Sequence, residues 1–353
     1  MDPTYAGAYG RIKAYTTDFL RPSFVEDLKH IDDLEEITRQ LYNTSYREDI
    51  DALSALYKNP VLLEMAINRH LITKNKVALF APPPASKDLI KAYLSKWDIQ
   101  NIKSIMSSKY LGYTIKESEA FLISFRDVPM GIFGGTMSHE DFRIMLSMGS
   151  IEDMINYLLK FGYQPILQHL EIYRKTKDVS MLYSSLDAFY YSRLMSLLKF
   201  YNGDEGPLIR FFREEIDSNN IMVLLKAKDL DVGVDRISSF VIPGGTLSMD
   251  DLKELFSLPT VEDVLARLKD RYNFEEELRV YNLEGTLGQF DTRMKKERLE
   301  KYLPTFESQS LSIGSIFSLL LRAEIERENL HSIVYAKTYK LDPEKLGNII
   351  ILR

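Results

Sequence analysis

Gly134-Gly135-Thr136-Met137-Ser138 is the first of two matching stretches in this chain, and the second is Gly244-Gly245-Thr246-Leu247-Ser248. The likeness continues to Leu158 and Leu268 with a constant offset of 110, and nine of the 25 aligned positions are identical. Self-similarity at a fixed spacing is typical of chains built from copies of one supersecondary unit. The sequence therefore predicts a repeat protein whose units bury their apolar faces against one another, and such proteins more often bind than catalyse.

A second pattern occurs three times, and we call it the signature. An acid is followed three residues later by Asn and eleven residues later by Lys, with aliphatic residues between them. On a helix the acid, the aliphatic residues and the Lys lie along one stripe, with the Asn at its flank. The three copies are Asp98, Asn101 and Lys109; Asp217, Asn220 and Lys228; and Glu326, Asn329 and Lys337.

The signature has two main interpretations. In the first, the Asn satisfies backbone groups of a neighbouring loop while the acid and the Lys pair with adjacent parts of the fold. In the second, these side chains contact a partner at the middle of the molecule. The first is favoured because buried polar groups usually serve packing. A catalytic role is a third, weaker alternative.

The fold class predicted from periodicity is all-α. Most of the chain reads as amphipathic helix, for example Ile31 to Leu41, with apolar residues at 31, 34, 37 and 41. Two short apolar runs, Val77 to Phe80 and Asn348 to Leu352, are candidates for strands but are equally readable as helix ends. Neither is long enough to carry an architecture.

Domain boundaries are expected where Pro and Gly gather, at residues 81–84, 202–207 and 283–288. We predict three similar helical lobes: residues 1–175 with an amino-terminal extension, residues 176–283, and a truncated third lobe at residues 284–353. The third copy lacks the Gly-Gly-Thr segment.

The Gly-Gly-Thr-x-Ser stretch also has two interpretations. In the structural one, the glycines form a turn and Ser138 or Ser248 caps the next helix, with Asp141 or Asp251 three residues on. Ser150 with Asp153, and Thr260 with Asp263, would repeat this one helix later. The other interpretation is a phosphate-binding loop, which is disfavoured because the Lys and Ser/Thr of such a loop do not follow the second glycine.

Composition excludes several classes of function. The net charge of −6 argues against a protein that coats nucleic acid. The chain has no cysteine, so thiolate chemistry and disulfides are impossible, and its five histidines show no metal-ligand spacing. No metal or other cofactor is predicted, and a helical hydrolase using acidic residues lacks a recognisable acid, base or nucleophile set. The longest apolar runs, such as Ile316 to Leu321, are too short to cross a bilayer.

The order and recurrence of these motifs resemble the C subunit of archaeal-type and vacuolar-type rotary ATPases, called the d subunit in the eukaryotic enzyme. The resemblance covers nearly the whole chain. Family members often carry a basic residue two positions before the signature Lys, which Lys226 matches and Ser107 and Tyr335 do not. Besides the signature and the glycine stretch, the resemblance rests on Tyr9-Gly10-Arg11-Ile12-Lys13, Leu41-Tyr42-Asn43-Thr44-Ser45-Tyr46 and Leu186-Asp187-x-x-Tyr190-Tyr191.

The resemblance implies a funnel-shaped protein of three lobes around a pseudo-threefold axis, without catalytic activity of its own. It implies a central-stalk adaptor that joins the axle, made of the D and F subunits, to the membrane proteolipid ring and transmits torque for proton or sodium transport. Such a protein is peripheral, on the cytoplasmic face of the membrane, and the nine signature residues would brace or line its socket. The rival class is a helical-repeat scaffold that binds an unrelated protein.

Overall fold

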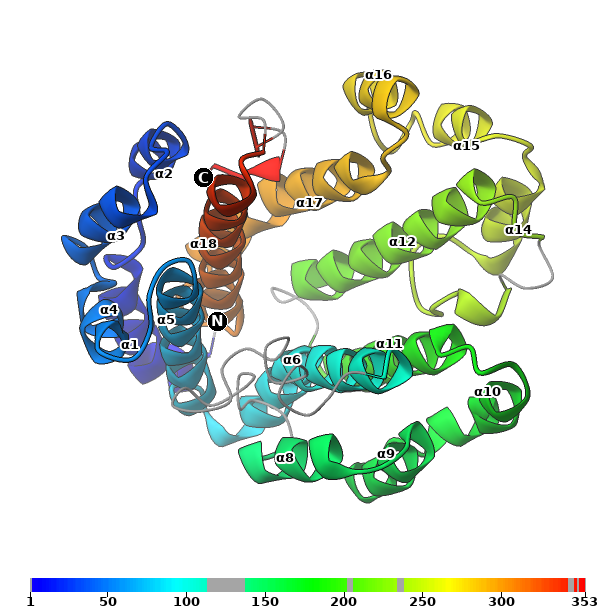
Figure 1. Cartoon of the computed structure of the whole chain (residues 1–353), viewed down its shortest axis with the longest axis horizontal. Coiled ribbons are helices and arrows are strands. Elements are labelled where there is room, and N and C mark those ends of the chain that lie inside the picture. The colour runs from blue at the N-terminus through cyan, green and yellow to red at the C-terminus, as the bar shows by residue number, and fades with distance from the viewer. Residues whose placement is uncertain are drawn as a thin grey trace. The chain divides into compact units, whose positions relative to one another are not determined.

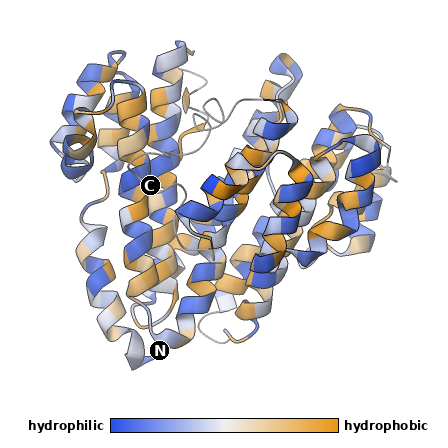
Figure 2. Ribbon diagram, turned by 60° about the horizontal axis from the view of Figure 1, so that its bottom comes forward, coloured by the Kyte–Doolittle hydropathy of each residue, from blue (hydrophilic) through white to orange (hydrophobic). Residues whose placement is uncertain are grey.

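The computed structural model describes residues 2–112, 137–201, 206–233, 238–341, 346–347 and 349–352. Within these ranges every regular element is a helix, as Figure 1 shows, so the predicted all-α class is confirmed. Hydrophobic and hydrophilic residues alternate along the helices in Figure 2, as expected of helices that pack on one side and meet water on the other.

The chain forms two compact units. The first comprises residues 1–149 and 305–353, and the second comprises residues 150–304. The division into three lobes at residues 175 and 283 stays a prediction.

The first unit is centred on two long, buried helices that lie against each other, α5 and α18. The amino-terminal helices pack against this pair, with α1, α2 and α3 contacting α18 and α4 contacting α5. Its helices are α1 (Ala6–Thr16), α2 (Pro22–Lys29), α3 (Leu34–Tyr42), α4 (Arg47–Ser54), α5 (Val61–Phe80), α6 (Pro84–Tyr110), α8 (His139–Ser147) and α18 (Gly314–Tyr339).

The second unit has a core built around the long helix α12. Ile221 and Leu224 of α12 pack with residues of α14 and α15 and with Phe274 and Phe290, and all four of these side chains are buried. Its helices are α9 (Ile151–Leu158), α10 (Leu170–Thr176), α11 (Ser180–Leu198), α12 (Gly206–Asp229), α14 (Met249–Ser257), α15 (Val261–Arg267), α16 (Glu275–Glu284) and most of α17 (Gly288–Ser308).

The predicted helix caps are confirmed. Ser138 and Ser248 cap α8 and α14, and each forms a reciprocal capping box with the Asp three residues later. Ser150 and Thr260 cap α9 and α15 by accepting the amide hydrogens of Asp153 and Asp263. Gly134, Gly135 and Thr136 of the first glycine stretch lie outside the described residues.

Two local predictions need correction or resolution. The helix expected from Ile31 begins only at Leu34, because Asp33 is extended and its side chain accepts the amide hydrogen of Glu35 as an N-cap. The run from Val77 to Phe80 is the last turn of α5, not a strand. Ile349 is helical and 350–352 have no regular structure.

The three signature helices also end alike. The residue 14 positions after each signature acid has a positive φ: 72° at Gly112, 51° at Asp231 and 54° at Lys340. A left-handed residue directly after a helix closes its last turn. The repeat therefore extends beyond the signature to the helix end, although only the first copy has glycine there.

Candidate functional site

The nine predicted site residues lie at equivalent places on α6, α12 and α18. The three acids and the three asparagines are buried, with the acids between 0% and 7% exposed. The three lysines are only partly exposed. Because buried polar groups require partners, the contacts of each set show what the signature does. The acids are Asp98, Asp217 and Glu326, and the asparagines are Asn101, Asn220 and Asn329.

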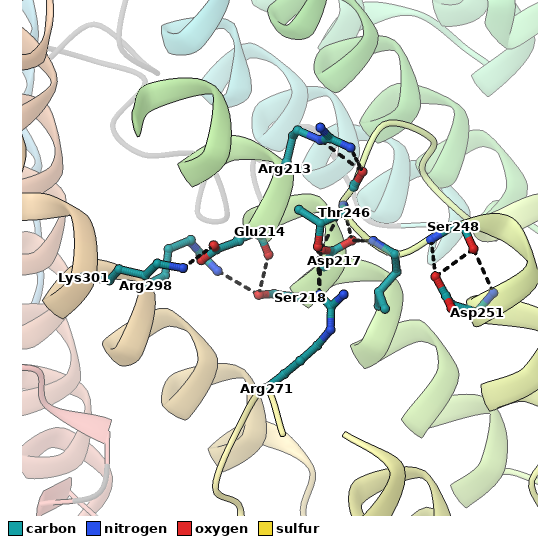
Figure 3. Close-up of polar contacts among 12 residues, drawn as sticks. Arg213, Glu214, Asp217, Ser218, Thr246, Ser248, Asp251, Arg271, Arg298 and Lys301 are labelled. Atoms are coloured by element: carbon teal, nitrogen blue, oxygen red, sulfur yellow. Dashed lines mark hydrogen bonds and ion pairs between the residues drawn. The ribbon is translucent and has the colours of Figure 1, made fainter. Parts of the chain in front are cut away.

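Asp217 holds the glycine stretch of the second copy (Figure 3). Its carboxylate accepts the amide hydrogen of Thr246 at 2.9 Å and 3.0 Å and that of Leu247 at 3.0 Å. It also accepts the Thr246 hydroxyl hydrogen. Hydrogen bonds to an ionised acceptor are about twice as strong as neutral ones, so this single carboxylate fixes the turn before α14.

Gly245 is required by the close approach of that turn. A Cβ at this position would lie 2.1 Å from Oδ1 of Asp217 and 3.4 Å from the Ile216 side chain. Two arginines hold the turn from outside. Arg213 donates to the Gly245 carbonyl at 2.8 Å and 3.2 Å, and Arg271 donates to Thr246 Oγ1 at 2.8 Å and lies 3.6 Å from Asp217 Oδ2. The second Gly-Gly-Thr stretch is therefore a turn, as predicted, and it is hydrogen-bonded to a buried carboxylate.

Two of the asparagines each bind both the carbonyl and the amide group of one residue. Asn220 donates to the carbonyl of Ile242 and accepts its amide hydrogen, both at 2.8 Å. Asn329 makes the same pair of bonds with Ile351, at 2.7 Å and 2.9 Å. Each partner lies 22 residues after its Asn. The Nδ2 atom of Asn101 has no hydrogen-bond partner within the described part of the chain.

The lysines of the first two copies bind the ends of short helices. Lys109 donates to the carbonyl of Leu146 at 3.0 Å and also to that of Met148, at the end of α8. Lys228 donates to the carbonyl of Phe256 at 2.5 Å, at the end of α14. A cation here satisfies free carbonyls and the negative end of the helix dipole. These lysines therefore secure the repeated short helix.

Lys337 of the third copy has a different kind of partner, a carboxylate. It pairs with Asp32 Oδ1 at 2.9 Å. This hydrogen bond and the lysine charge lower the pKa of the exposed Asp32 carboxyl. The third lysine thus fastens the segment before α3.

Glu326 also binds the amino-terminal region. It accepts the amide hydrogen of Leu20 at 2.6 Å and the Tyr46 hydroxyl hydrogen at 2.8 Å. Burial raises the pKa of Glu326, while these two donors and the nearby His70 and Lys74 oppose that rise. The loop between α1 and α2 therefore takes the place that the glycine stretch holds on α12.

Lys74 fixes the same loop from α5. Its side chain is 1% exposed, and its ammonium nitrogen lies 2.8 Å from Asp18 Oδ2. Ser45 donates to the Asp18 carbonyl at 2.7 Å. Helices α5 and α18 and the turn between α3 and α4 therefore hold this loop.

Sequence reasoning missed a second repeated acid. Glu215 accepts a hydrogen bond from Tyr191 at 2.8 Å and lies 3.7 Å from Arg298. Glu324, 109 residues later, accepts one from Tyr93 at 2.7 Å and one from Lys96 at 2.5 Å. The available signal was a Glu two residues before the signature acid in the second and third copies. The first copy has Lys96 there, which pairs with Glu324.

No described helix is long and apolar enough to cross a membrane. Among the described residues, no group of three or more His, Asp or Glu side chains is placed to hold a metal ion. The buried polar groups whose contacts are described above bind backbone or one another. Their arrangement braces helices and loops.

Comparison with known proteins identifies the class. The chain matches the ATP synthase (C/AC39) subunit family over residues 8–349. It is 43% identical to the C subunit of A-type ATP synthase from Thermoplasma volcanium over 99% of both chains, and equally identical to that of Thermoplasma acidophilum over the same share. The corresponding protein of Methanocaldococcus jannaschii is 25% identical over 98% of this chain and 86% of its own.

The chain belongs to the ATP synthase C/AC39 subunit family, which comprises the C or d subunit of the rotary ATPases. The resemblance seen in the signature and the glycine stretch is thereby confirmed. The protein is thus similar over its full length to subunits of A-type ATP synthase.

Proposed function

We propose that the protein is a non-catalytic adaptor in the central stalk of an A-type or V-type ATPase. It joins the axle formed by the D and F subunits to the membrane proteolipid ring, and it transmits torque between ATP chemistry and the movement of protons or sodium ions. The observation that carries this proposal is the full-length similarity to proteins named as the C subunit of A-type ATP synthase.

The bracing contacts suit a part that must bear load. A torque-transmitting body has to resist relative movement of its helices and loops. Buried carboxylates and asparagines that bind backbone atoms fix loops in one geometry. Moving the loop would leave buried backbone groups without a partner, at a cost of about 1–3 kcal/mol each. Asp217 and Glu326 each hold a loop in this way.

We propose that the nine signature residues brace the socket that receives the axle. The burial of the acids and asparagines favours bracing over direct partner contact. Under this proposal three similar lobes surround the socket around a pseudo-threefold axis, and the protein sits on the cytoplasmic face of the membrane through the ring.

An affinity experiment tests the function. The purified, tagged chain is incubated with detergent-solubilised membranes of its source organism, and retained proteins are identified by mass spectrometry. Recovery of the D and F subunits together with the proteolipid supports the adaptor. Retention of an unrelated protein in their absence would instead support the scaffold.

A further inference from the structure

The second unit contains a pocket of about 250 Å³ beside the glycine turn. Its floor is apolar and consists of Leu247, Leu255 and Leu268, from the turn, α14 and α15. Small-molecule sites generally occupy about 300–1,000 Å³, so this pocket is below the size expected for a cofactor. Its volume suits one long side chain.

The rim of the pocket is charged. Asp251, Glu254 and Asp270 contribute carboxylates, and Arg267 and Arg271 contribute guanidinium groups. Both arginines already have acidic neighbours within the chain, since Arg267 lies 2.7 Å from Glu254 and Arg271 lies 3.6 Å from the buried Asp217.

The carboxylates therefore outnumber the cations. Three carboxylates and two guanidinium groups line the pocket and leave a net charge of −1. Asp251 remains ionised in this setting, because hydrogen bonds from Ser248, and to a smaller extent the charges of Arg271 and Arg267, lower its pKa. An apolar floor below an acidic rim complements an aliphatic stem that ends in a positive charge.

The first copy carries a cation of its own near the equivalent position. The repeat offset of 110 places Tyr157 at the position of Arg267 and, extended two residues beyond the matching stretch, Lys160 at that of Asp270. The Lys160 ammonium lies 3.5 Å from the centre of the Tyr157 ring. The second copy has a carboxylate, Asp270, at this position in place of the lysine.

We propose that this pocket receives a lysine or arginine side chain from a protein partner within the rotary complex. The choice of partner rests on the proposed function. Charge complementarity of this kind supplies orientation and specificity to an interface.

The test compares two charge reversals in the full-length chain. Asp270 is exposed and lines the pocket, whereas Asp250 is 94% exposed, lies in the first turn of α14 and is absent from the pocket lining. D270K and D250K therefore make the same change in net charge inside and outside the pocket. Binding to the purified D and F subunits and to the detergent-solubilised proteolipid ring is measured at two salt concentrations, after thermal unfolding has shown that both variants fold.

We expect D270K to weaken binding about tenfold or more, D270N to weaken it less, and D250K to leave it within about twofold. Equal losses in D270K and D250K would overturn the proposal in favour of general charge attraction. A change in self-association of the isolated D270K chain without a change in binding to the D and F subunits or the ring would also overturn it, since the occupant would be a second copy. If the wild-type chain binds and D270K binds equally well, the proposed role of the pocket is overturned and the proposed function stands. If the wild-type chain itself fails to bind, the proposed function is overturned as well.

Discussion

The buried acids of the second and third signature helices both bind a loop, but the two loops come from different parts of the chain. On α12, Asp217 binds a turn only 29 and 30 residues further along, through the amides of Thr246 and Leu247. On α18, Glu326 binds Leu20, which lies 306 residues earlier. The donors to Glu326, the Leu20 amide and the Tyr46 hydroxyl, both come from the amino-terminal region. In these two copies the signature carboxylate holds a loop, and the segment that it holds differs.

The largest expected effect comes from removing the two carboxylates. Asp217→Ala leaves two amides and a hydroxyl without their acceptor, whereas Glu326→Ala leaves one amide and one hydroxyl. At about 1–3 kcal/mol for each unsatisfied donor, we expect losses of about 4 kcal/mol and about 3 kcal/mol in the free energy of unfolding.

Urea denaturation of both variants measures this difference, with Asp250→Ala as the control. The Asp250 side chain is 94% exposed, so its removal should change stability by less than about 0.5 kcal/mol. A larger loss for Glu326→Ala than for Asp217→Ala would contradict the comparison.

Gly245 offers a second way to test the turn on α12. Gly245→Ala would place a methyl group 2.1 Å from Asp217 Oδ1, and that carboxylate is held by several donors and cannot easily move. We expect a loss of about 2–3 kcal/mol in the free energy of unfolding.

The control is Gly149→Ala, because a Cβ at Gly149 meets nothing within 4 Å. Thermal unfolding of the two variants should separate them clearly. Equal stability would mean that the turn moves away from Asp217 at little cost.

The contrast between the two helices also marks the limit of what sequence can predict. Ser248 and Asp251 were identifiable as a cap because their hydrogen bonds link residues three apart. The bonds of Glu326 to Leu20 and Tyr46 join residues 306 and 280 apart, and no local pattern encodes them. Helix class and caps follow from local chemistry, whereas partners of buried charges depend on how distant helices pack.

The same limit explains the missed acids. Glu215 and Glu324 look like ordinary surface residues of amphipathic helices in the sequence. Their tyrosine and cationic partners come from other helices or from a different copy of the repeat. Only alignment of the signature copies, extended by two residues, would have singled them out.

Titration tests the buried environment of Glu326. Burial raises the folded-state pKa of Glu326 above its ordinary value of 4.5, so the folded protein binds this proton more tightly than the unfolded chain does. The contribution of Glu326 to stability should therefore fall as pH rises from about 4.5 through the folded-state pKa.

Glu326→Gln cannot titrate and should lack this fall, which urea midpoints at several pH values between about 4 and 7 would show. Asp32 gives the opposite sign. Its pKa is lowered from 3.8 by Lys337, so its contribution is present above that value and is lost as pH falls below it. Wild type and Glu326→Gln with parallel pH profiles would contradict the assignment to Glu326.

The smallest effect concerns the helix ends that the three copies share. Asp231 and Lys340 adopt positive φ where the first copy has Gly112. A left-handed conformation costs a non-glycine residue about 1–2 kcal/mol. Replacing that residue with glycine removes this cost, but part of the gain is lost because glycine has greater freedom in the unfolded chain. We therefore expect Asp231→Gly and Lys340→Gly each to raise the free energy of unfolding by about 0.5–1 kcal/mol, and Gly112→Ala to lower it by about 1 kcal/mol. Chemical denaturation of the three variants would show whether the ends are energetically equivalent.

If Asp231→Gly is stabilised and Lys340→Gly is destabilised, the third helix end depends on the lysine side chain. The copies would then differ at their helix ends as they do in the partners of their acids.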